Sequence, residues 1–470
     1  MTARRAVRWE AAAFGLVAVV AAAVRLYDLG GPALAPAEAP SAAIAWSVAR
    51  GERALDPADP AWSQASPLLT SAQLLTFGLL GGSGEAAARL PSALAGTALC
   101  LLPWLVRRRL GMRTALVLAA VIALDPLCVE ASRRADGAAM AAFLGAAVIA
   151  GLRRAWWGFA AAAAGLLLVA GAAAWTIAPV VALVCLLDRP SVGARVGPLA
   201  AVAGTAALLG ASGFLAAWAL VGGVSASLTS WLAAWSSADA FGSGPASWPG
   251  ALLGDPLPFV LGGAGLLWLI RSRRLGAVAV IVASLGWTAR LAVRPGGDPA
   301  ALMLAVLILT AAVAPALEEI GDRLGRVTTR PPRWTLATGA LLGALALPGL
   351  ARTGRILAGP GSGPASAGPG LLAADVERLS WERAGDAHEL PVEVVCQPRP
   401  DPALRWVLRG ARYLSFHSGS FDPRGSDRAL VVSPEAPPDA EPPCEAPPSR
   451  SGARYQVGRQ VVVLWVPREP

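Results

Sequence analysis

A series of long apolar stretches constrains this chain more than any other feature of its sequence. A helix crosses the hydrocarbon of a bilayer in about 20 residues, so each apolar stretch of roughly that length bounded by Arg, Pro or Gly is a candidate span. We predict about eleven, near residues 10–26, 86–106, 113–128, 137–152, 156–171, 173–187, 197–221, 251–270, 275–293, 300–318 and 334–350. Gly171 is the only break between the fifth and sixth stretches, which are therefore either two spans or one. The composition agrees, because 55% of the residues are hydrophobic and only 15% are charged.

The distribution of basic residues predicts the orientation of these spans. Cytoplasmic loops carry an excess of basic residues, and here every second loop is rich in Arg, beginning with the N-terminus. The sequence therefore predicts a multi-pass protein of the plasma membrane with a cytoplasmic N-terminus. Arg25 and the absence of a small-x-small cleavage site favour a retained first span over a cleaved signal peptide. The net charge of +9 does not predict a nucleic-acid partner, because the arginines recur between apolar runs.

Two of the predicted outside loops are too long to be simple connections. In the first, residues 38–51 and 67–80 have helical periodicity, so we predict two helices at the membrane interface. In the second, near 222–250, Trp231 and Trp235 share a helix face and Trp248 precedes the next span. These tryptophans form either an aromatic belt at the headgroups or a lid over a lipid-linked substrate.

The chain after the last span predicts a small soluble domain. We expect three parts: a membrane domain over 1–350, a Gly/Pro/Ser-rich linker over 351–370 and an extracytoplasmic α/β domain over 371–470. Helices are predicted at 371–385 and 402–411, and strands at 392–396, 413–418, 428–433 and 460–466. Cys396 and Cys444 in this domain either form a disulfide or stay free.

The order of short motifs in residues 25–160 resembles a known superfamily. RLYDLG (25–30) is followed by PAEAPSAAIAWSVARG (36–51), LDP (55–57), SPLLT (66–70), ARLPSALAG (88–96) and SRRAD (132–136). This series is similar to the GT-C superfamily of integral-membrane glycosyltransferases, which includes protein O-mannosyltransferases and aminoarabinose transferases of lipid A. The spacing of LDP and SPLLT and a WVLR-containing tail (406–409) resemble the subgroup of flippase-activity-associated membrane proteins.

The resemblance implies a chemistry and a position for it. The donor is expected to be a sugar on polyprenyl phosphate, and an acidic residue of an Asp-Glu pair just after the first span is expected to deprotonate the acceptor. Here Ala37 stands where the resemblance places the Asp, so Glu38 is the remaining carboxylate of the pair. Glu38 is either the base itself or the remnant of a site that no longer transfers sugar.

Five further residues are candidates on the same resemblance. Asp136 is expected to act with Glu38, and Arg133 or Arg134 to hold the phosphate with Arg89, because guanidinium groups stabilise a leaving phosphate. Asp56 also matches a substrate-site position, although an Asp before Pro is a common turn former. For Arg133, Arg134 and Asp136 the alternative is an ion pair that only ends a helix, and for Arg89 it is an arginine that snorkels to the membrane surface.

No cofactor and no metal site are predicted, because His388 and His417 lack ligand spacing and Glu38 and Asp136 are far apart in sequence. The expected partners are a polyprenyl-phosphate sugar, an extracytoplasmic glycan, lipid or protein acceptor, and membrane lipids. The leading hypothesis is a membrane glycosyltransferase-like protein. The alternative is a catalytically degenerate relative that binds or helps translocate lipid-linked glycans. A secondary transporter is less favoured, because the spans show no clear inverted repeat.

Overall fold

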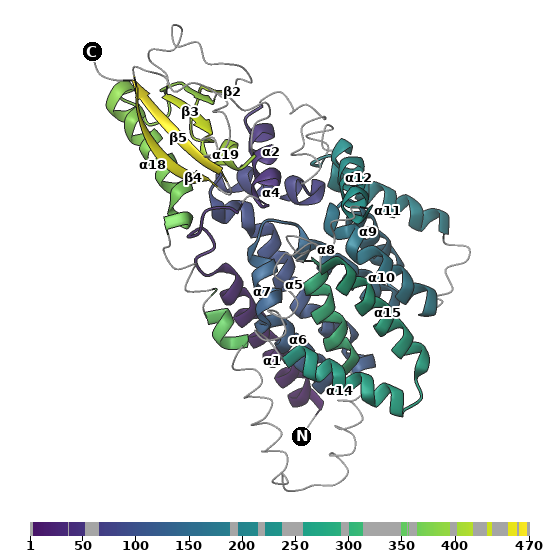
Figure 1. The fold of residues 1–470 in the computed structure, drawn as a ribbon. Coiled ribbons are helices and arrows are strands. Elements are labelled where there is room, and N and C mark those ends of the chain that lie inside the picture. The colour runs from purple at the N-terminus through teal and green to yellow at the C-terminus, as the bar shows by residue number, and fades with distance from the viewer. Residues whose placement is uncertain are drawn as a thin grey trace.

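The protein is mostly helical, with a small sheet at the end of the molecule farthest from the N-terminus (Figure 1). The computed structural model describes residues 3–35, 37–51, 65–188, 196–214, 221–236, 257–292, 300–313, 349–354, 356, 364–394, 402–416, 430–434, 450–457 and 460–467. The helices are α1 (Ala3–Leu26), α2 (Ala39–Ala49), α4 (Pro67–Leu80), α5 (Glu85–Leu110), α6 (Met112–Leu124), α7 (Pro126–Arg133), α8 (Ala138–Arg153), α9 (Trp157–Leu168), α10 (Ala172–Asp188), α11 (Val196–Ala211), α12 (Gly222–Ser236), α14 (Leu257–Arg271), α15 (Leu275–Ala292), α18 (Pro364–Ala384) and α19 (Pro402–Val407). Residues 300–313 are also helical.

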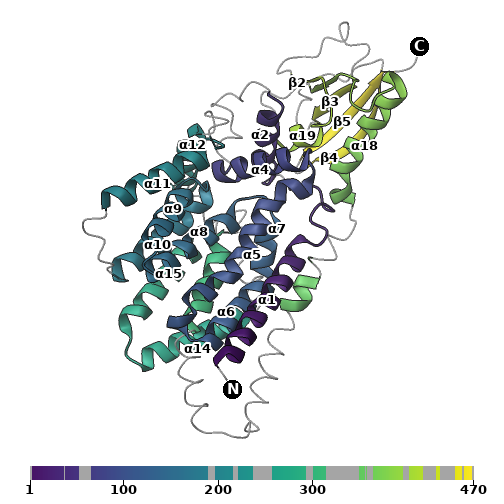
Figure 2. The same cartoon turned by 180° about the vertical axis from the view of Figure 1, so that it is seen from behind.

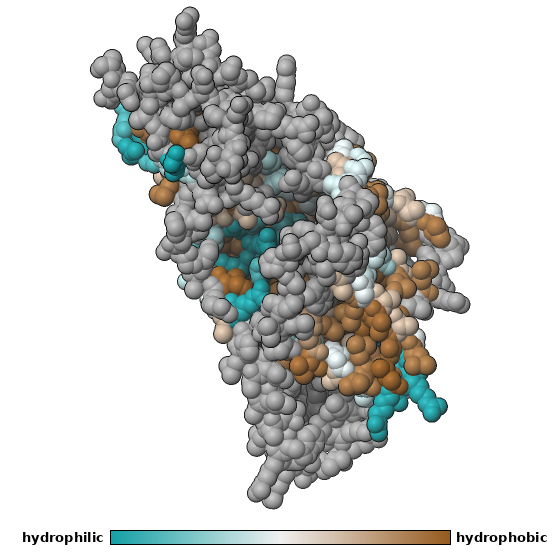
Figure 3. Space-filling model, viewed as in Figure 1, coloured by the Kyte–Doolittle hydropathy of each residue, from teal (hydrophilic) through white to brown (hydrophobic). Residues whose placement is uncertain are grey.

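The helical part carries hydrophobic side chains on its outside. Leu186, Leu267 and Val282 are among the exposed large apolar residues, and Figure 3 shows hydrophobic surface gathered over α10, α14 and α15. Surface of this extent is unusual for a soluble protein and is suited to contact with lipid.

The span count stays a prediction. In the described part, Glu85–Leu110 alone is long and apolar enough to cross a membrane, and Thr114–Leu124 with Pro126–Arg133 passes the same test as a pair bent by 57°. The other apolar helices have 10–17 residues. Gly171 separates two helices, α9 and α10. The predicted span over 113–128 is not continuous, because one helix ends at Leu124 and the next begins at Pro126.

The break between α6 and α7 has a clear chemical cause. Pro126 has no backbone N–H, so the carbonyl of Ile122 loses its helical partner. Arg25 of α1 replaces it, with Nη2 donating to the Ile122 oxygen and Nη1 to the Ala123 oxygen, both at 3.0 Å. Asp125 caps the new helix by accepting a hydrogen bond from its first turn at 2.8 Å. Arg25 is fully buried and closes the break from inside the helical part.

The predicted outside loop near 222–250 contains a helix, α12. Trp231 of α12 packs against Trp287 of α15, with ring centroids 6.0 Å apart, beside buried Leu291 and Ala301. Trp231 is therefore part of a helix contact. The side chain of Trp235 and all of Trp248 lie outside the described residues, so the belt and the lid both stay predictions.

The C-terminal sheet mixes parallel and antiparallel pairing. Its strands are β1 (Val392–Val394), β2 (Leu414–Phe416), β3 (Leu430–Pro434), β4 (Arg450–Val457) and β5 (Gln460–Pro467), in the order β2-β1-β3-β5-β4. β1 runs parallel to β2 and β3, whereas β5 runs antiparallel to β3 and β4. Val376 of α18 and Leu404 of α19 share a core with Val392 and Leu464 of the sheet.

Two elements here differ from the sequence prediction. β4 was not predicted, because RSGARYQV is polar and becomes a strand by pairing along the whole length of apolar β5. α18 begins at Pro364, inside the stretch predicted as linker. Proline is favoured in the first turn of a helix, where its missing N–H has no intrahelical role. The domain boundaries themselves stay predictions.

The sheet shares its core with the helices of the first loop (Figures 1 and 2). Phe77 of α4 stacks on Trp406 of α19 with ring centroids 6.0 Å apart, and Trp46 of α2 meets Phe77 edge-on at the same distance. Arg409 adds an ion pair to Glu85 at the start of α5, at 2.9 Å. The C-terminal residues are therefore packed onto α2, α4 and α5.

One titration should report on the packing of α18 against β4. The hydroxyl of Tyr455 donates to Oδ2 of Asp375 at 2.6 Å, and burial together with this bond raises the pKa of Tyr455 to about 12. The protonated phenol is favoured in the folded state, so its contribution to stability is present below pH 10 and is lost as the pH rises towards 12. A pH titration of tyrosinate absorbance should show a step near pH 12 in wild type, and this step should be missing in Tyr455→Phe. If Tyr455→Phe instead removed a step at the ordinary tyrosine pKa, the contact with Asp375 would be contradicted; Tyr413→Phe, which removes an exposed tyrosine, is the control and should keep the step near pH 12.

Candidate functional site

The N-terminus of α2 carries Glu38 in a buried hydrogen-bond network. Glu38 is 2% exposed. Its Oε1 accepts from Nε of Arg89 at 3.0 Å and from the backbone N–H of Ala135 at 2.8 Å. Its Oε2 accepts from Nη2 of Arg89 at 2.9 Å and from the N–H of Ala35 at 2.7 Å. A carboxylate offers about four acceptor positions, so those of Glu38 are filled.

Arg89 fixes the loop that precedes Glu38. It comes from the second turn of α5 and is 5% exposed. Beyond its two bonds to Glu38, Nη1 donates to the carbonyls of Leu29 and Pro32 at 3.1 and 2.7 Å. Nη2 also donates to the carbonyl of Ala33 at 3.0 Å. All five N–H donors of the guanidinium are thereby used, and Arg89 holds Leu29, Pro32, Ala33 and Glu38 together.

Ala37 lies beside this network with its side chain exposed. Its neighbour Glu38 turns inward, so positions 37 and 38 face different surroundings. The exposed position, where the resemblance expects an Asp, has no carboxylate.

Arg133 is occupied by the end of the first helix. Its Nη1 donates to the carbonyls of Val24 and Tyr27 at 3.0 and 2.6 Å, and its Nη2 to that of Asp28 at 3.4 Å. The last carbonyls of a helix lack intrahelical donors, and a cation there also complements the helix dipole. The contacts of Arg133 are those of a cap on α1.

Arg134 and Asp136 form a partly exposed ionic cluster in the turn after α7. Nε of Arg134 lies 3.5 Å from Oδ2 of Asp136, and Nη1 lies 3.8 Å from Oε1 of Glu130. Oδ1 of Asp136 accepts the N–H of Ala138 at 3.0 Å, which begins α8. Arg352, 222 residues further along the chain than Glu130, joins this cluster with Nη2 at 3.2 Å from Oε2 of Glu130. In Figure 3 the surface is hollowed at the level of α7 and shows hydrophilic residues there.

A glycine-rich contact places the start of α4 against the same region. Ser66 caps α4 by accepting from the N–H of Leu69 at 3.3 Å and donates to the carbonyl of Ala170 at 3.0 Å. Gly171 has a φ of +78°, and a Cβ there would lie 2.9 Å from Cα of Ser66. Gly137, with a φ of +82°, also approaches Ser66, because a Cβ there would lie 3.1 Å from the serine side chain. The loops before α4, α8 and α10 therefore meet at backbone distance.

The structure brings most of the predicted site residues together. Glu38, Arg89 and the SRRAD turn are joined through the Ala135 N–H, next to Asp136. Asp56 lies outside the described residues. Sequence reasoning missed Glu130 and Arg352, which are separated by 222 residues and carry no shared motif. The predicted roles of these residues in substrate binding and catalysis stay hypotheses.

The described residues include only some of the His and Cys residues for which the sequence makes a prediction. Among the described residues, no group of three or more His, Cys, Asp or Glu is arranged to hold a metal ion. His388 is exposed, while His417, Cys396 and Cys444 lie outside the described residues. The disulfide therefore stays a prediction. Cys100 and Cys128 are free and buried.

Comparison with known proteins identifies the fold. No protein-family model and no curated protein matches the sequence. A crystal structure of ArnT, the aminoarabinose transferase from Cupriavidus metallidurans, bound to undecaprenyl phosphate, matches with a TM-score of 0.56 at 17% identity, over 96% of this chain and 97% of that one. The oligosaccharyltransferase of Archaeoglobus fulgidus tethered to an acceptor peptide matches with a TM-score of 0.54 at 13% identity, over 87% of this chain and 63% of that one. The same enzyme in complex with Zn and sulfate gives 0.53 at 13% identity, over 90% and 68%.

These matches show the fold of the chain. ArnT and the oligosaccharyltransferase are both GT-C glycosyltransferases. This chain has the GT-C fold, as its motifs predict, and spans less than two thirds of the first oligosaccharyltransferase chain.

Proposed function

We propose that this protein is a membrane glycosyltransferase of the GT-C type, which takes a sugar from a polyprenyl-phosphate carrier and transfers it to an acceptor on the extracytoplasmic side. The observation that carries the proposal is the convergence of the loop after α1, the start of α5 and the SRRAD turn on the Glu38 carboxylate. This convergence builds a polar site from motifs that are distant in sequence. The fold shared with ArnT bound to undecaprenyl phosphate supports the choice of donor.

Within this function we assign Glu38 a positioning role. A general base needs a lone pair within reach of the acceptor proton, and the four acceptor positions of Glu38 are filled by Arg89, Ala35 and Ala135. Asp136 is the candidate for orienting the acceptor, because it directly follows Ala135, whose N–H donates to Glu38. Arg134 is the better candidate for the phosphate, since the described donors of Arg133 serve the carbonyls of α1.

The orientation follows from the arginine pattern. It puts the N-terminus in the cytoplasm and the Glu38 network, the SRRAD turn and the C-terminal α/β domain outside. The packing of Trp406 on Phe77 supports a single side for the first loop and that domain.

The second candidate function is binding or translocation of a lipid-linked glycan without sugar transfer. It is favoured by the exposed Ala37, because this position would present a carboxylate to a substrate if it were an Asp. In that case the Glu38–Arg89 network preserves the scaffold of an enzyme that has lost its base.

A transfer assay with the purified protein and polyprenyl-phosphate sugars separates the two. If the protein is a transferase, wild type should transfer sugar, and Asp136→Asn should reduce the rate by at least about tenfold, since misplacing a reactant by about 1 Å costs up to about 10²-fold. Asp386→Asn in the C-terminal part is the matched control and should leave the rate unchanged.

The remaining outcomes are equally informative. No transfer by wild type but transfer by Ala37→Asp would identify a degenerate enzyme. Retained binding of the polyprenyl-phosphate sugar with no transfer in either variant would favour the carrier role. A protein that neither binds nor transfers these lipids would contradict both candidates.

A further inference from the structure

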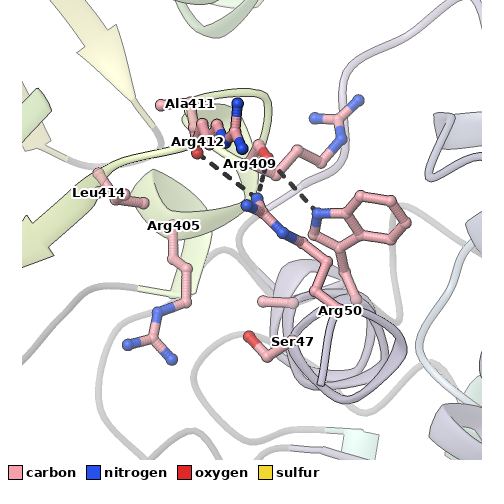
Figure 4. A pocket seen from close by; sticks show the side chains of 9 residues that line it. Ser47, Arg50, Arg405, Arg409, Ala411, Arg412 and Leu414 are labelled. Carbon is pink, nitrogen blue, oxygen red and sulfur yellow. Dashed lines mark hydrogen bonds between the residues drawn. The ribbon is translucent and has the colours of Figure 1, made fainter. Parts of the chain in front are cut away.

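A polar cavity lies at the C-terminal end of α2, where the helix meets α19. It has a volume of about 110 Å³ and is lined by Ala43, Trp46, Ser47, Arg50, Arg405, Arg409, Ala411, Arg412 and Leu414. A partly enclosed space of this size holds a group several times larger than a water molecule. Figure 4 shows the Arg50 guanidinium between Ser47 of α2 and the residues around α19.

The cavity is strongly basic. Four arginines line it, and its described lining contains no Asp or Glu. Among the described carboxylates, Glu85 pairs with Arg409 and Glu389 pairs with Arg412, and both of these lie outside the lining. Charges of one sign gathered around a partly enclosed space raise the local concentration of opposite charge.

The arginines differ in how firmly they are held. Arg50 is fixed, because its Nη1 donates to the carbonyls of Arg409 and Ala411 at 3.2 and 3.4 Å. Arg409 is also fixed, with its guanidinium over the ring of Trp406 and its Nη2 on Glu85. The Arg412 side chain is 61% exposed and meets Glu389 at 3.5 Å, a surface pair that is worth little and exchanges readily. The walls are thus rigid while Arg412 can turn towards a ligand.

We propose that this cavity binds an oxyanion of the phosphate class. Guanidinium groups bind phosphate in paired, charge-assisted hydrogen bonds, and several of them around one space suit a group with more than one negative charge. The cavity is separate from the Glu38 network, because Arg50 is twelve residues further along the chain, or about 18 Å along a helix. A phosphate on a soluble glycan and a phosphate in a lipid headgroup present this same chemistry.

The test uses the full chain in nanodiscs of zwitterionic lipid, with inorganic pyrophosphate as the probe and thermal unfolding as the readout. Pyrophosphate should raise the unfolding temperature of wild type at constant ionic strength. Arg405→Gln and Arg412→Gln should each weaken binding by about tenfold, the loss of one charge-assisted hydrogen bond. Both side chains are partly exposed, so these variants should fold. Arg383→Gln makes the same charge change on exposed α18 outside the cavity and should bind like wild type.

Equal pyrophosphate shifts in wild type and in all three variants would overturn the proposal, as would no shift in wild type. A second arm replaces part of the zwitterionic lipid by phosphatidylglycerol and omits pyrophosphate. Stabilisation that depends on Arg405 and Arg412 would identify a lipid headgroup as the source of the phosphate. Pyrophosphate binding without an effect of phosphatidylglycerol would identify a phosphate in solution or on a glycan.

Discussion

Arg89→Leu should lower the free energy of unfolding by about 3–5 kcal/mol, because removal of one partner leaves the buried Glu38 carboxylate without its counter-charge. Three backbone carbonyls, those of Leu29, Pro32 and Ala33, would lose their donors in the same step. Thermal or denaturant unfolding of the purified protein in detergent measures the effect. We expect the loop before α2 to become accessible to proteases in the variant.

Arg412→Leu is the matched control for this prediction. It removes an arginine of an ion pair whose side chains are 61% and 50% exposed, and exposed pairs contribute about 0–1 kcal/mol. If both substitutions had the same small effect, Arg89 would not hold the first loop in the way described.

Gly165→Ala should destabilise the packing of α9 against α11 by about 1–3 kcal/mol or more. A Cβ at Gly165 would run into the backbone oxygen of Ala203, and a backbone atom cannot turn aside as a side chain can. The two helices would have to separate, which membrane helices avoid by placing small residues where they touch. The measurement is again the unfolding temperature of the purified protein.

Gly204→Ala tests the same prediction from the neighbouring position on α11. A Cβ at Gly204 meets nothing within 4 Å, and alanine in a helix interior is favoured over glycine by about 0.5–1 kcal/mol. This variant should therefore be as stable as wild type or more stable. Destabilisation of similar size in both variants would mean that helix contact is not the cause.

The sequence is informative about the fold because its signals are local or ordered along the chain. Apolar length predicts the helical membrane part, and periodicity predicts α2 and α4 within two residues of their ends. The order of RLYDLG, PAEAP, ARLPSALAG and SRRAD predicts the GT-C fold. The same order explains why Glu38 and the SRRAD turn are adjacent, since the fold brings these segments to one end of the bundle.

What the sequence does not predict depends on backbone groups and on distant residues. The acceptor positions of Glu38 are filled by the N–H groups of Ala35 and Ala135 as well as by Arg89. Every residue except proline has a backbone N–H, so the residue types do not show which of these groups binds the carboxylate. The break before Pro126 is stabilised by Arg25, which a sequence assigns equally well to a membrane boundary. The arginine cavity joins Arg50 to residues 405–414, and no periodicity links segments so far apart.

The stacking of Phe77 on Trp406 has a consequence for how this protein is made. More than three hundred residues separate the two rings, so a ribosome adds all of them after Phe77 before the second ring exists. Until then α4 carries an uncovered aromatic face, and Nε1 of Trp46 on α2 lacks its acceptor, the carbonyl of Arg409. The first loop therefore completes its packing late in biogenesis. A chain that stops before α19 would leave this aromatic surface exposed, where the quality-control machinery of the cell can recognise it.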